Sequence, residues 1–235
     1  MGSEMCIRDS AACDQSLEAL LLELPQEAHS PATWTPSLTA IDEGLTVPAQ
    51  VNYVGKAANL FALGYELDGS SAVITRYLAT TWLWDRVRVQ GGAYGAFCSF
   101  DPFTGVFAYA SYRDPNLLET LQVYDQSGSF LRDYPISNDE LTKAIIGTIG
   151  DFDAYQLPDA KGYASLVRYL TGIDDDYRQQ MRDQVLGTKV EYFADFAAVL
   201  DQVGVAGRVA VLGSADAIAA ASAARDNWLT PVKVL

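Results

Sequence analysis

Histidine is almost absent from this sequence, which holds a single one, His29, among 235 residues. One histidine cannot convincingly complete a serine–histidine–aspartate arrangement or an imidazole-rich zinc site, so both kinds of active centre are disfavoured. We expect His29 to be a solvated residue of a linker bounded by prolines. The three cysteines are widely spaced and form no C-x-x-C pair, so they indicate neither a disulfide framework nor a zinc knuckle and favour a reducing compartment.

Basic residues are also few, because 16 lysines and arginines stand against 30 acidic residues, for a net charge of −14. This charge repels nucleic-acid phosphates and anionic lipid surfaces, so we expect neither as a partner, and it attracts basic peptides. A simple contribution to solubility is the preferred explanation of the acidity. No apolar run approaches the roughly 20 residues that cross a bilayer, so no membrane span is expected.

The sequence does contain the composition of a folded domain, with 49% hydrophobic and 20% charged residues. Its first ten residues have neither the apolar core of a secretory signal nor the acid-poor composition of a transit peptide. We interpret them as an arbitrary leader that is not native. Leucines at helical spacing predict a connecting helix over 16–24, and the prolines that follow indicate a linker. We therefore predict a leader and linker over 1–33 and one main domain over 34–235, beginning near Trp34.

Patterns along the main domain predict an α+β fold with an antiparallel-rich sheet and helices packed on one face. Enrichment in β-branched and aromatic residues predicts strands over 47–54, 93–100, 106–112, 208–212 and 232–235. The second and third of these form a hairpin across the turn Asp101–Gly105. The last is expected at an edge of the sheet.

Capping residues mark where helices begin. Ser70 is available as the N-cap of a helix that ends near Gly91 and Gly92, and the pair Asp114-Pro115 places a proline at the first position of another helix. The first of these helices precedes the predicted hairpin in the sequence, and the second follows it.

Two capping boxes, Ser137–Glu140 and Thr188–Glu191, predict further helix starts, the first with Ile136 and Leu141 as a hydrophobic staple. The acidic triplet Asp174 to Asp176 opens a helix between them. Such a triplet could suggest a metal site, but stabilisation of the helix dipole is the better explanation. Ser214 is expected to cap an alanine-rich helix near the end of the sequence.

The glycine-rich stretch Gly91–Gly95 resembles a phosphate-binding loop but follows a helix and precedes a strand, the reverse of the order that nucleotide sites need. Its glycines instead allow a tight passage from helix to strand. This passage projects Arg88 and Tyr94 toward the same region. Arginine offers fixed donors for carbonyl or carboxylate oxygens, and a tyrosine hydroxyl can stabilise a developing oxyanion. The alternative is an ordinary helix-end ion pair and a packed tyrosine.

Five segments together resemble the C-terminal domains of the presequence protease family, zinc peptidases of the pitrilysin or insulinase group. They are residues 51–59, 80–95, 111–116, 145–151 and 155–163. The resemblance runs from about Trp34 to the end of the sequence and is specific, because long segments occur in the right order.

The resemblance implies a complete enzyme of two bowl-shaped halves, each with two similar α+β domains, around a chamber that admits peptides. In this family the first half carries an H-x-x-E-H motif, and the last domain supplies an arginine and a tyrosine that reach the substrate near the metal. By resemblance those residues are Arg88 and Tyr94. Asp85, Arg86 and Gln90 adjoin them and could shape the chamber, although solvated helix positions explain these three equally well.

This sequence has no H-x-x-E-H, so the resemblance implies no zinc in this chain and zinc in the complete enzyme. The expected function is the substrate-binding domain of a zinc endopeptidase for short unstructured peptides, inactive alone. Its expected partners are the N-terminal catalytic half of the same protein and the peptide. The expected location is the cytoplasm in a bacterium, or the mitochondrial or plastid matrix in a eukaryote. The alternative is a non-catalytic scaffold or peptide-binding subunit of the same fold.

Overall fold

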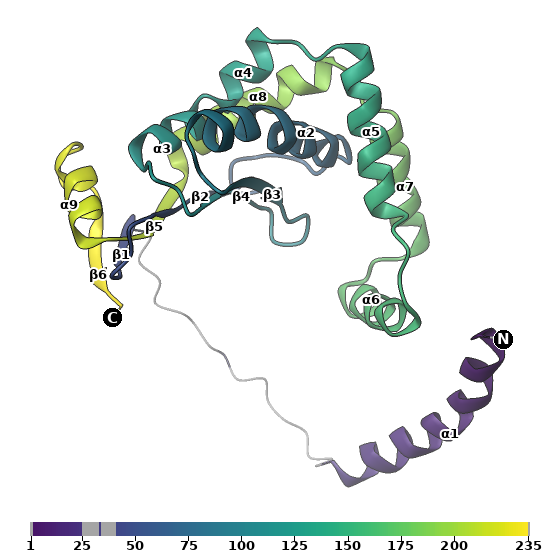
Figure 1. Ribbon diagram of the computed structural model, residues 1–235. Coiled ribbons are helices and arrows are strands. Elements are labelled where there is room, and N and C mark those ends of the chain that lie inside the picture. Colours follow the sequence, from purple (N-terminus) through teal and green to yellow (C-terminus); the bar gives the residue numbers. More distant parts are fainter. Residues whose placement is uncertain (1, 25–32, 34–40, 235) are drawn as a thin grey trace. The chain divides into compact units, whose positions relative to one another are not determined.

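The computed structural model describes residues 2–24, 33 and 41–234, and side chains from residue 13 onward. The chain divides into two compact units, Met1–Thr39 and Ala40–Leu235. The first holds helix α1, Gly2–Glu23, which begins well before the predicted helix over 16–24 (Figure 1). His29 and the predicted domain start at Trp34 lie outside the described residues, so both stay predictions.

A mixed sheet forms the centre of the second unit, in the order β3-β4-β2-β5-β1-β6. Strand β1 runs parallel to β5 and β6, whereas the other neighbouring pairs are antiparallel. The strand bounds are β1 Glu43–Thr46, β2 Tyr53–Asn59, β3 Gly95–Phe100, β4 Val106–Tyr112, β5 Arg208–Gly213 and β6 Thr230–Lys233. The predicted hairpin is confirmed as β3 and β4, and β6 is the expected edge strand.

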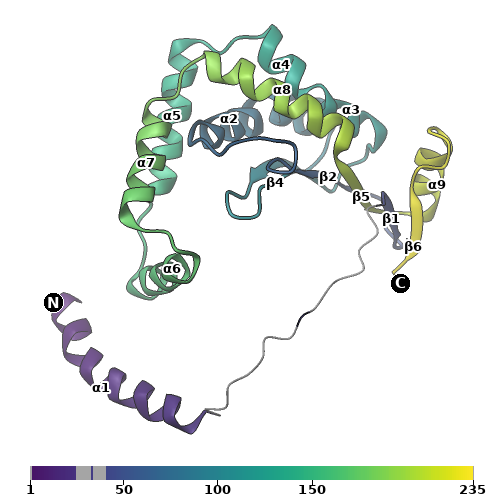
Figure 2. The same ribbon diagram turned by 180° about the vertical axis from the view of Figure 1, so that it is seen from behind.

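Helices cover one face of this sheet, as predicted. In both views, α2, α3 and α8 lie on the same side of β2 and β4 (Figures 1 and 2). The helices of this unit are α2 Ser70–Leu78, its π-helical continuation η1 Ala79–Gln90, α3 Leu118–Asp125, α4 Ser127–Asp133, α5 Asn138–Phe152, α6 Pro158–Thr171, α7 Asp175–Leu186, α8 Glu191–Ala206 and α9 Ala215–Ala223.

Strand periodicity decides which residues reach the core. Val54 on β2 and Phe107 and Tyr109 on β4 are buried beneath the helices, and Val211 on β5 joins them. The ring of Tyr109 stacks on that of Tyr124 from α3. The Tyr124 hydroxyl donates a hydrogen bond to the Val54 carbonyl. Removing such large side chains from water is worth roughly 1.5–3 kcal/mol each, so this layer holds α3 against the sheet.

The predicted strand over 47–54 is wrong in position. Residues 47–51 form a loop, Asn52 makes an isolated bridge to Asp114, and β2 begins only at Tyr53. Strand β1 had no prediction. Pro48 cannot donate to a strand ladder, which explains why the pairing does not extend through this segment. The sequence of β2 is rich in glycine and alanine, so its strand character comes from its neighbours in the sheet rather than from intrinsic propensity.

The helix predicted from Asp114-Pro115 begins instead at Leu118. The buried carboxylate of Asp114 accepts hydrogen bonds from the Asn116 backbone N–H at 2.9 Å and the Thr120 hydroxyl at 2.7 Å. It thereby ties the turn to the first residues of α3. Pro115 therefore lies in this turn and not in the helix, because the turn provides hydrogen-bond donors to the Asp114 carboxylate.

Two other predicted caps are also wrong. Ser70 is the first residue of α2, and the carboxylate of Asp68 accepts its N–H. The Thr188 hydroxyl donates to carbonyls at the end of α7 instead of capping α8. The capping box at Ser137 and the cap by Ser214 are confirmed. The acidic triplet opens α7 as predicted, with Asp174 as its N-cap.

Lys56 is a charged residue inside the covered face of the sheet. Its ammonium group donates to Asp125 on α3 at 2.5 Å and to the Gly204 carbonyl on α8 at 2.6 Å. Its side chain is only 7% exposed, so these two acceptors replace most of its hydration. One lysine therefore links β2 to two helices.

We expect Lys56→Met to lower the free energy of unfolding by about 2–4 kcal/mol, because it leaves a carboxylate and a carbonyl without their donor. Urea unfolding followed by circular dichroism measures the loss. The matched control is Lys143→Met, which breaks an exposed pair with Asp139 and should cost less than about 0.5 kcal/mol. Similar losses in both variants would contradict a special role for Lys56.

Candidate active site

The candidate site lies where η1 passes into β3. The last turn of η1 has the hydrogen-bond spacing of a π-helix. The Gly91 N–H donates to the carbonyl of Arg86, five residues earlier, at 3.0 Å. The helix covers 12 residues, whereas π-helical geometry is usually confined to a single turn. Such segments are frequent at functional sites, which directs attention to the residues at the end of η1.

Two glycines make the passage possible, as the sequence predicted. Gly92 has φ +81°, a left-handed conformation that favours glycine. A Cβ on Gly91 would lie 2.6 Å from the Val87 carbonyl oxygen, which leaves no room for a side chain. The Asn116 side chain fixes the turn by donating to the Gly91 carbonyl at 2.6 Å.

Arg88 is held on two sides. Its Nε donates to the backbone carbonyl of Tyr94 at 3.1 Å, and its guanidinium lies 3.9 Å from the centroid of the Trp84 ring. Within the described part of the chain it forms no ion pair, so the helix-end ion pair considered above is absent there. Its two terminal nitrogens carry donors that no described residue accepts.

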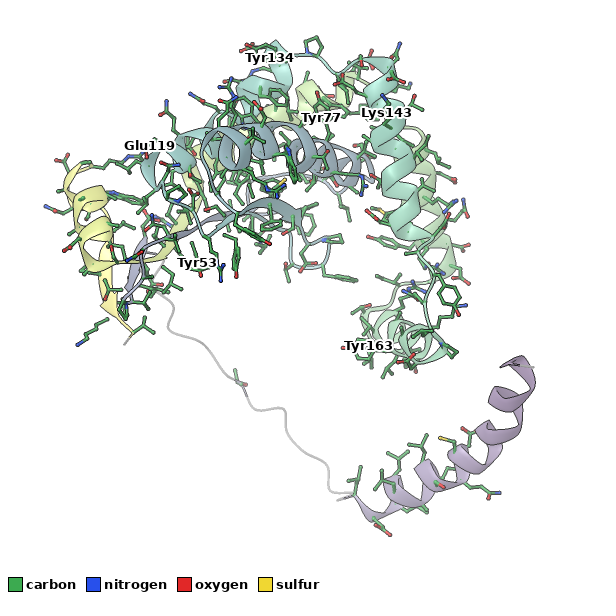
Figure 3. All side chains as sticks on the ribbon, in the orientation of Figure 1. Tyr53, Tyr77, Glu119, Tyr134, Lys143 and Tyr163 are labelled. Carbon is green, nitrogen blue, oxygen red and sulfur yellow. The ribbon has the colours of Figure 1, made fainter. Side chains whose placement is uncertain are left out.

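Tyr94 presents its hydroxyl to solvent. The residue is 68% exposed, so it is not a packed tyrosine. Its N–H donates to the Tyr112 carbonyl at 3.0 Å, and its ring meets the edge of the Tyr112 ring at 5.8 Å. The Tyr112 ring in turn meets the ring of Tyr53 on β2, with centroids 5.3 Å apart. Tyr53 is labelled in Figure 3. The structure therefore brings Arg88 and Tyr94 together at one end of a row of aromatic rings.

Tyr112 and Arg113 lie beside this pair, before the turn at Asp114, and no helix begins there because α3 starts at Leu118. Arg113 has φ +50° and its guanidinium lies 5.5 Å from the Tyr112 ring centroid. Tyr53 and Trp84 were not singled out by the sequence, although their contacts position the pair. Only the spacing of Trp84 and Arg88, one helical turn apart, could have signalled their contact.

Small residues line the face of the sheet opposite α2, α3 and α8. We call it the open face and define it by Gly55, Ala57, Ala108 and Ala110. Gly55 pairs with Ala110 and Ala57 with Ala108 across β2 and β4. By strand alternation Tyr112 belongs to the same side, which places the Tyr94 ring at its border. A floor of glycine and alanine allows the backbone of another chain to approach closely.

The residues adjoining the motif bind one another. Gln90 donates to Asp85 at 2.7 Å, and Arg86 donates to Gln90 at 3.2 Å. All three are exposed, so a mutual surface network accounts for them. Cys98 on β3 is excluded as a nucleophile, because burial raises the pKa of its thiol to about 12.

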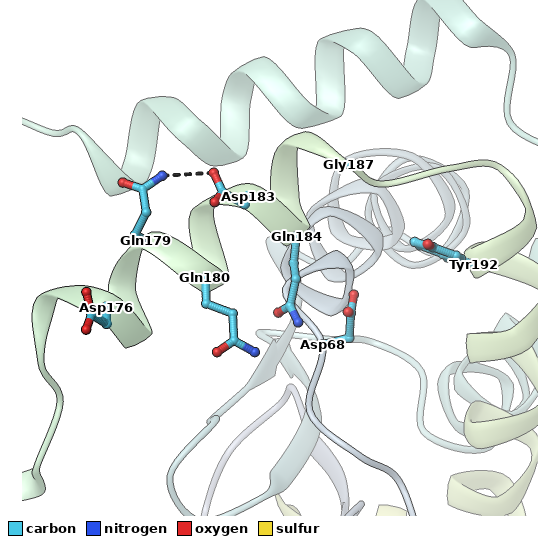
Figure 4. A pocket seen from close by; sticks show the side chains of 8 residues that line it. All are labelled: Asp68, Asp176, Gln179, Gln180, Asp183, Gln184, Gly187 and Tyr192. Carbon is cyan, nitrogen blue, oxygen red and sulfur yellow. Dashed lines mark hydrogen bonds between the residues drawn. The ribbon is translucent and has the colours of Figure 1, made fainter.

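A separate cavity of about 550 Å³ opens between α7 and the loop before α2 (Figure 4). It is lined by Asp68, Asp176, Gln179, Gln180, Asp183, Gln184, Gly187 and Tyr192. Its polar groups already support the fold, because Gln184 accepts the Gly69 N–H and Gln179 donates to Asp183. We assign this cavity no chemistry.

The described residues do not fit a zinc ion, because no three His, Cys, Asp or Glu side chains among them gather closely enough to hold a metal. Asp174 caps α7 and Asp175 pairs with Arg178, which accounts for two members of the acidic triplet. No helix in the described part is both long and apolar enough to cross a membrane.

The fold is that of a peptidase domain. A crystal structure of a peptidase M16 inactive domain from Pseudomonas fluorescens superposes with a TM-score of 0.60 at 19% identity, over 88% of this chain and 50% of that one. A predicted insulinase family protease from Yersinia pestis gives a TM-score of 0.54 at 14% identity, again over 88% and 50%. At these identities the likeness establishes the fold alone.

Sequence comparison identifies the family. Residues 42–215 match the family model described as PreP C-terminal domain. The chain is 54% identical to presequence protease 1, chloroplastic/mitochondrial, of Arabidopsis thaliana over 203 residues, which are 86% of this chain and 19% of that protein. It is 34% identical to protein HypA of Clostridium perfringens over 177 residues, 75% of this chain and 18% of that one. The chain therefore belongs to the presequence protease family, as the resemblance predicted, and spans about a fifth of the length of these relatives.

Proposed function

We propose that this chain is the substrate-contacting domain of a zinc endopeptidase that degrades short unstructured peptides. In this proposal Arg88 and Tyr94 are the residues that meet the peptide. The observation that carries it is that Arg88 binds the backbone carbonyl of Tyr94, an exposed tyrosine, so that a guanidinium and a phenol occur together at the border of the open face. Within the described part of the chain, no hydrogen-bond acceptor accounts for the terminal nitrogens of Arg88 or for the Tyr94 hydroxyl.

The two donors suit the hydrolysis of an amide. Attack on a peptide carbonyl places negative charge on its oxygen, and donors positioned in advance stabilise that charge without reorganising. The Tyr94 hydroxyl can donate one hydrogen bond to that oxygen. The terminal nitrogens of Arg88 can donate to a neighbouring carbonyl while its Nε remains on Tyr94.

An extended peptide fits the surroundings of the pair. Its backbone would lie over the open face, where Gly55 and Ala110 leave room, and its side chains would meet the rings of Tyr94 and Tyr112. The net charge of −14 favours basic peptides through long-range attraction, which salt weakens. Folded proteins cannot present an extended backbone in this way.

The metal and the group that activates water belong, in this proposal, to another part of a longer protein. The described residues offer no ligand set for zinc, and this chain matches only about a fifth of the length of these relatives. The partner is thus the N-terminal catalytic half. The compartment is the cytoplasm in a bacterium and the mitochondrial or plastid matrix in a eukaryote, in keeping with the names of the relatives.

A fluorogenic unstructured peptide tests the proposal with this chain and the preceding part of the longer protein, produced separately. We expect no cleavage by this chain alone, and turnover by the mixture at least about tenfold above that of the preceding part alone. A chelator should abolish the turnover of the mixture. Chelator-sensitive cleavage by this chain alone, or no gain on mixing, would contradict the proposal. A preceding part without H-x-x-E-H would favour a scaffold.

A further inference from the structure

Helix α6 has no buried residue. It connects α5 to α7, which pack against each other (Figures 1 and 2). Its sequence of 14 residues is nevertheless amphipathic. An amphipathic helix normally buries its apolar stripe against a core, so the position of α6 requires an explanation.

The apolar stripe of α6 consists of Tyr163, Leu166 and Leu170, which we call the α6 face. Their spacing of three and four residues aligns them along one side of the helix. They are 72%, 53% and 71% exposed, in that order; Tyr163 is labelled in Figure 3. Just before the helix, Tyr155 is also exposed, at 84%. Contiguous exposed apolar side chains of this size mark a surface that binds another protein surface.

The chemistry of the α6 face is that of an interface centre. The charged residues of the helix are Asp159, Lys161 and Arg168. Lys161 and Arg168 lie on other sides of the helix, and Asp159 lies one turn before Tyr163, at the end of the α6 face. Depletion of charge at the centre, with tyrosine present and charges at the rim, is typical of buried protein–protein contacts. A substrate of variable sequence would not offer a constant apolar complement, so a permanent neighbour fits this surface better than a peptide.

Proteins of this fold and family extend well beyond the length of this chain. It aligns with about half of the Pseudomonas fluorescens structure and about a fifth of the Arabidopsis relative. We propose that the α6 face docks on the N-terminal part of the longer protein, which rests on the function proposed above. The contact places α6 between the two parts and fixes how the Arg88–Tyr94 pair is presented to the catalytic half.

Hydrogen–deuterium exchange on the longer protein tests this contact without measuring turnover. We expect the amides of residues 158–171 to exchange at least about tenfold more slowly in the longer protein than in this chain alone, with no peptide present. Equal rates would overturn the proposal. Slowing only after a peptide is added would assign the surface to substrate, and slowing in this chain alone that grows with its concentration would assign it to a second copy. Either result also overturns the proposal.

The double variant Leu166→Ser and Leu170→Ser should return the exchange of α6 in the longer protein to the rate of the isolated chain. The matched control is Ile146→Ser, which removes an apolar side chain 65% exposed on α5 and should keep the slow exchange. Methionine at the same two positions should also keep it, which separates lost contact from lost helix. Loss of protection in the control or the methionine variant would overturn the assignment. Because no turnover is read, failure of this contact and failure of the Tyr94 role are distinguishable.

Discussion

Replacing Tyr94 with phenylalanine in the complete protein should lower kcat about 100-fold while leaving KM within about threefold. The ring and its contact with Tyr112 stay in place, so only the hydroxyl is lost. A donor that acts on the developing oxyanion contributes in the transition state and little in the ground state, which is why kcat changes and KM does not. Steady-state kinetics with a fluorogenic unstructured peptide measure both constants.

The matched control for this change is Tyr134→Phe, which removes another solvent-facing hydroxyl, at the end of α4 and away from β3 (Figure 3). Its kcat should stay within about twofold of the parent. Parent-like turnover by Tyr94→Phe would remove the proposed role of the hydroxyl. A rise in KM at unchanged kcat would mean that Tyr94 binds substrate and transition state equally.

Local signals in the sequence predicted the glycine passage at the candidate site but not the geometry around it. Gly91 and Gly92 predicted the passage from helix to strand, because a left-handed turn such as the one at Gly92 favours glycine. The capping box at Ser137 likewise predicted a helix start from interactions within four residues. Features of this kind can be predicted from the sequence because the interactions that stabilise them join residues close together in the chain.

Features that depend on distant neighbours were missed. The strand β2 exists because β4 and β5 pair with it, and its glycine and alanine residues gave little strand signal. Asp114 was assigned to a helix start, yet its carboxylate is used in a buried turn. The same limit applies to the site, since the exposure of Tyr94 and the uncovered floor beside it are properties of the whole sheet. The sequence could name the chemical groups but not establish which of them face solvent.

The proposed role of Arg88 depends both on local sequence signals and on the arrangement of the whole sheet. Its substitution should lower activity more than that of Tyr94. Arg88→Ala in the complete protein is expected to lower kcat/KM about 1,000-fold, since it removes a charged donor from the peptide and a hydrogen bond from the Tyr94 carbonyl at the same time. Removal of one transition-state donor costs about 100- to 1,000-fold, and the loosened turn places this variant at the upper end.

Arg88→Lys should recover only part of that loss, because a single ammonium group cannot hold the Tyr94 carbonyl and reach a peptide carbonyl together. Arg86→Ala is the matched control. It removes a guanidinium two residues earlier on η1, where the side chain bonds Gln90 at the surface, and kcat/KM should stay within about threefold. Full recovery by lysine would show that charge alone suffices, and equal losses at Arg86 and Arg88 would show that η1 tolerates no change. If Nε of Arg88 fixes the turn and its remaining nitrogens donate to the peptide, Arg88→Lys should recover only part of the activity.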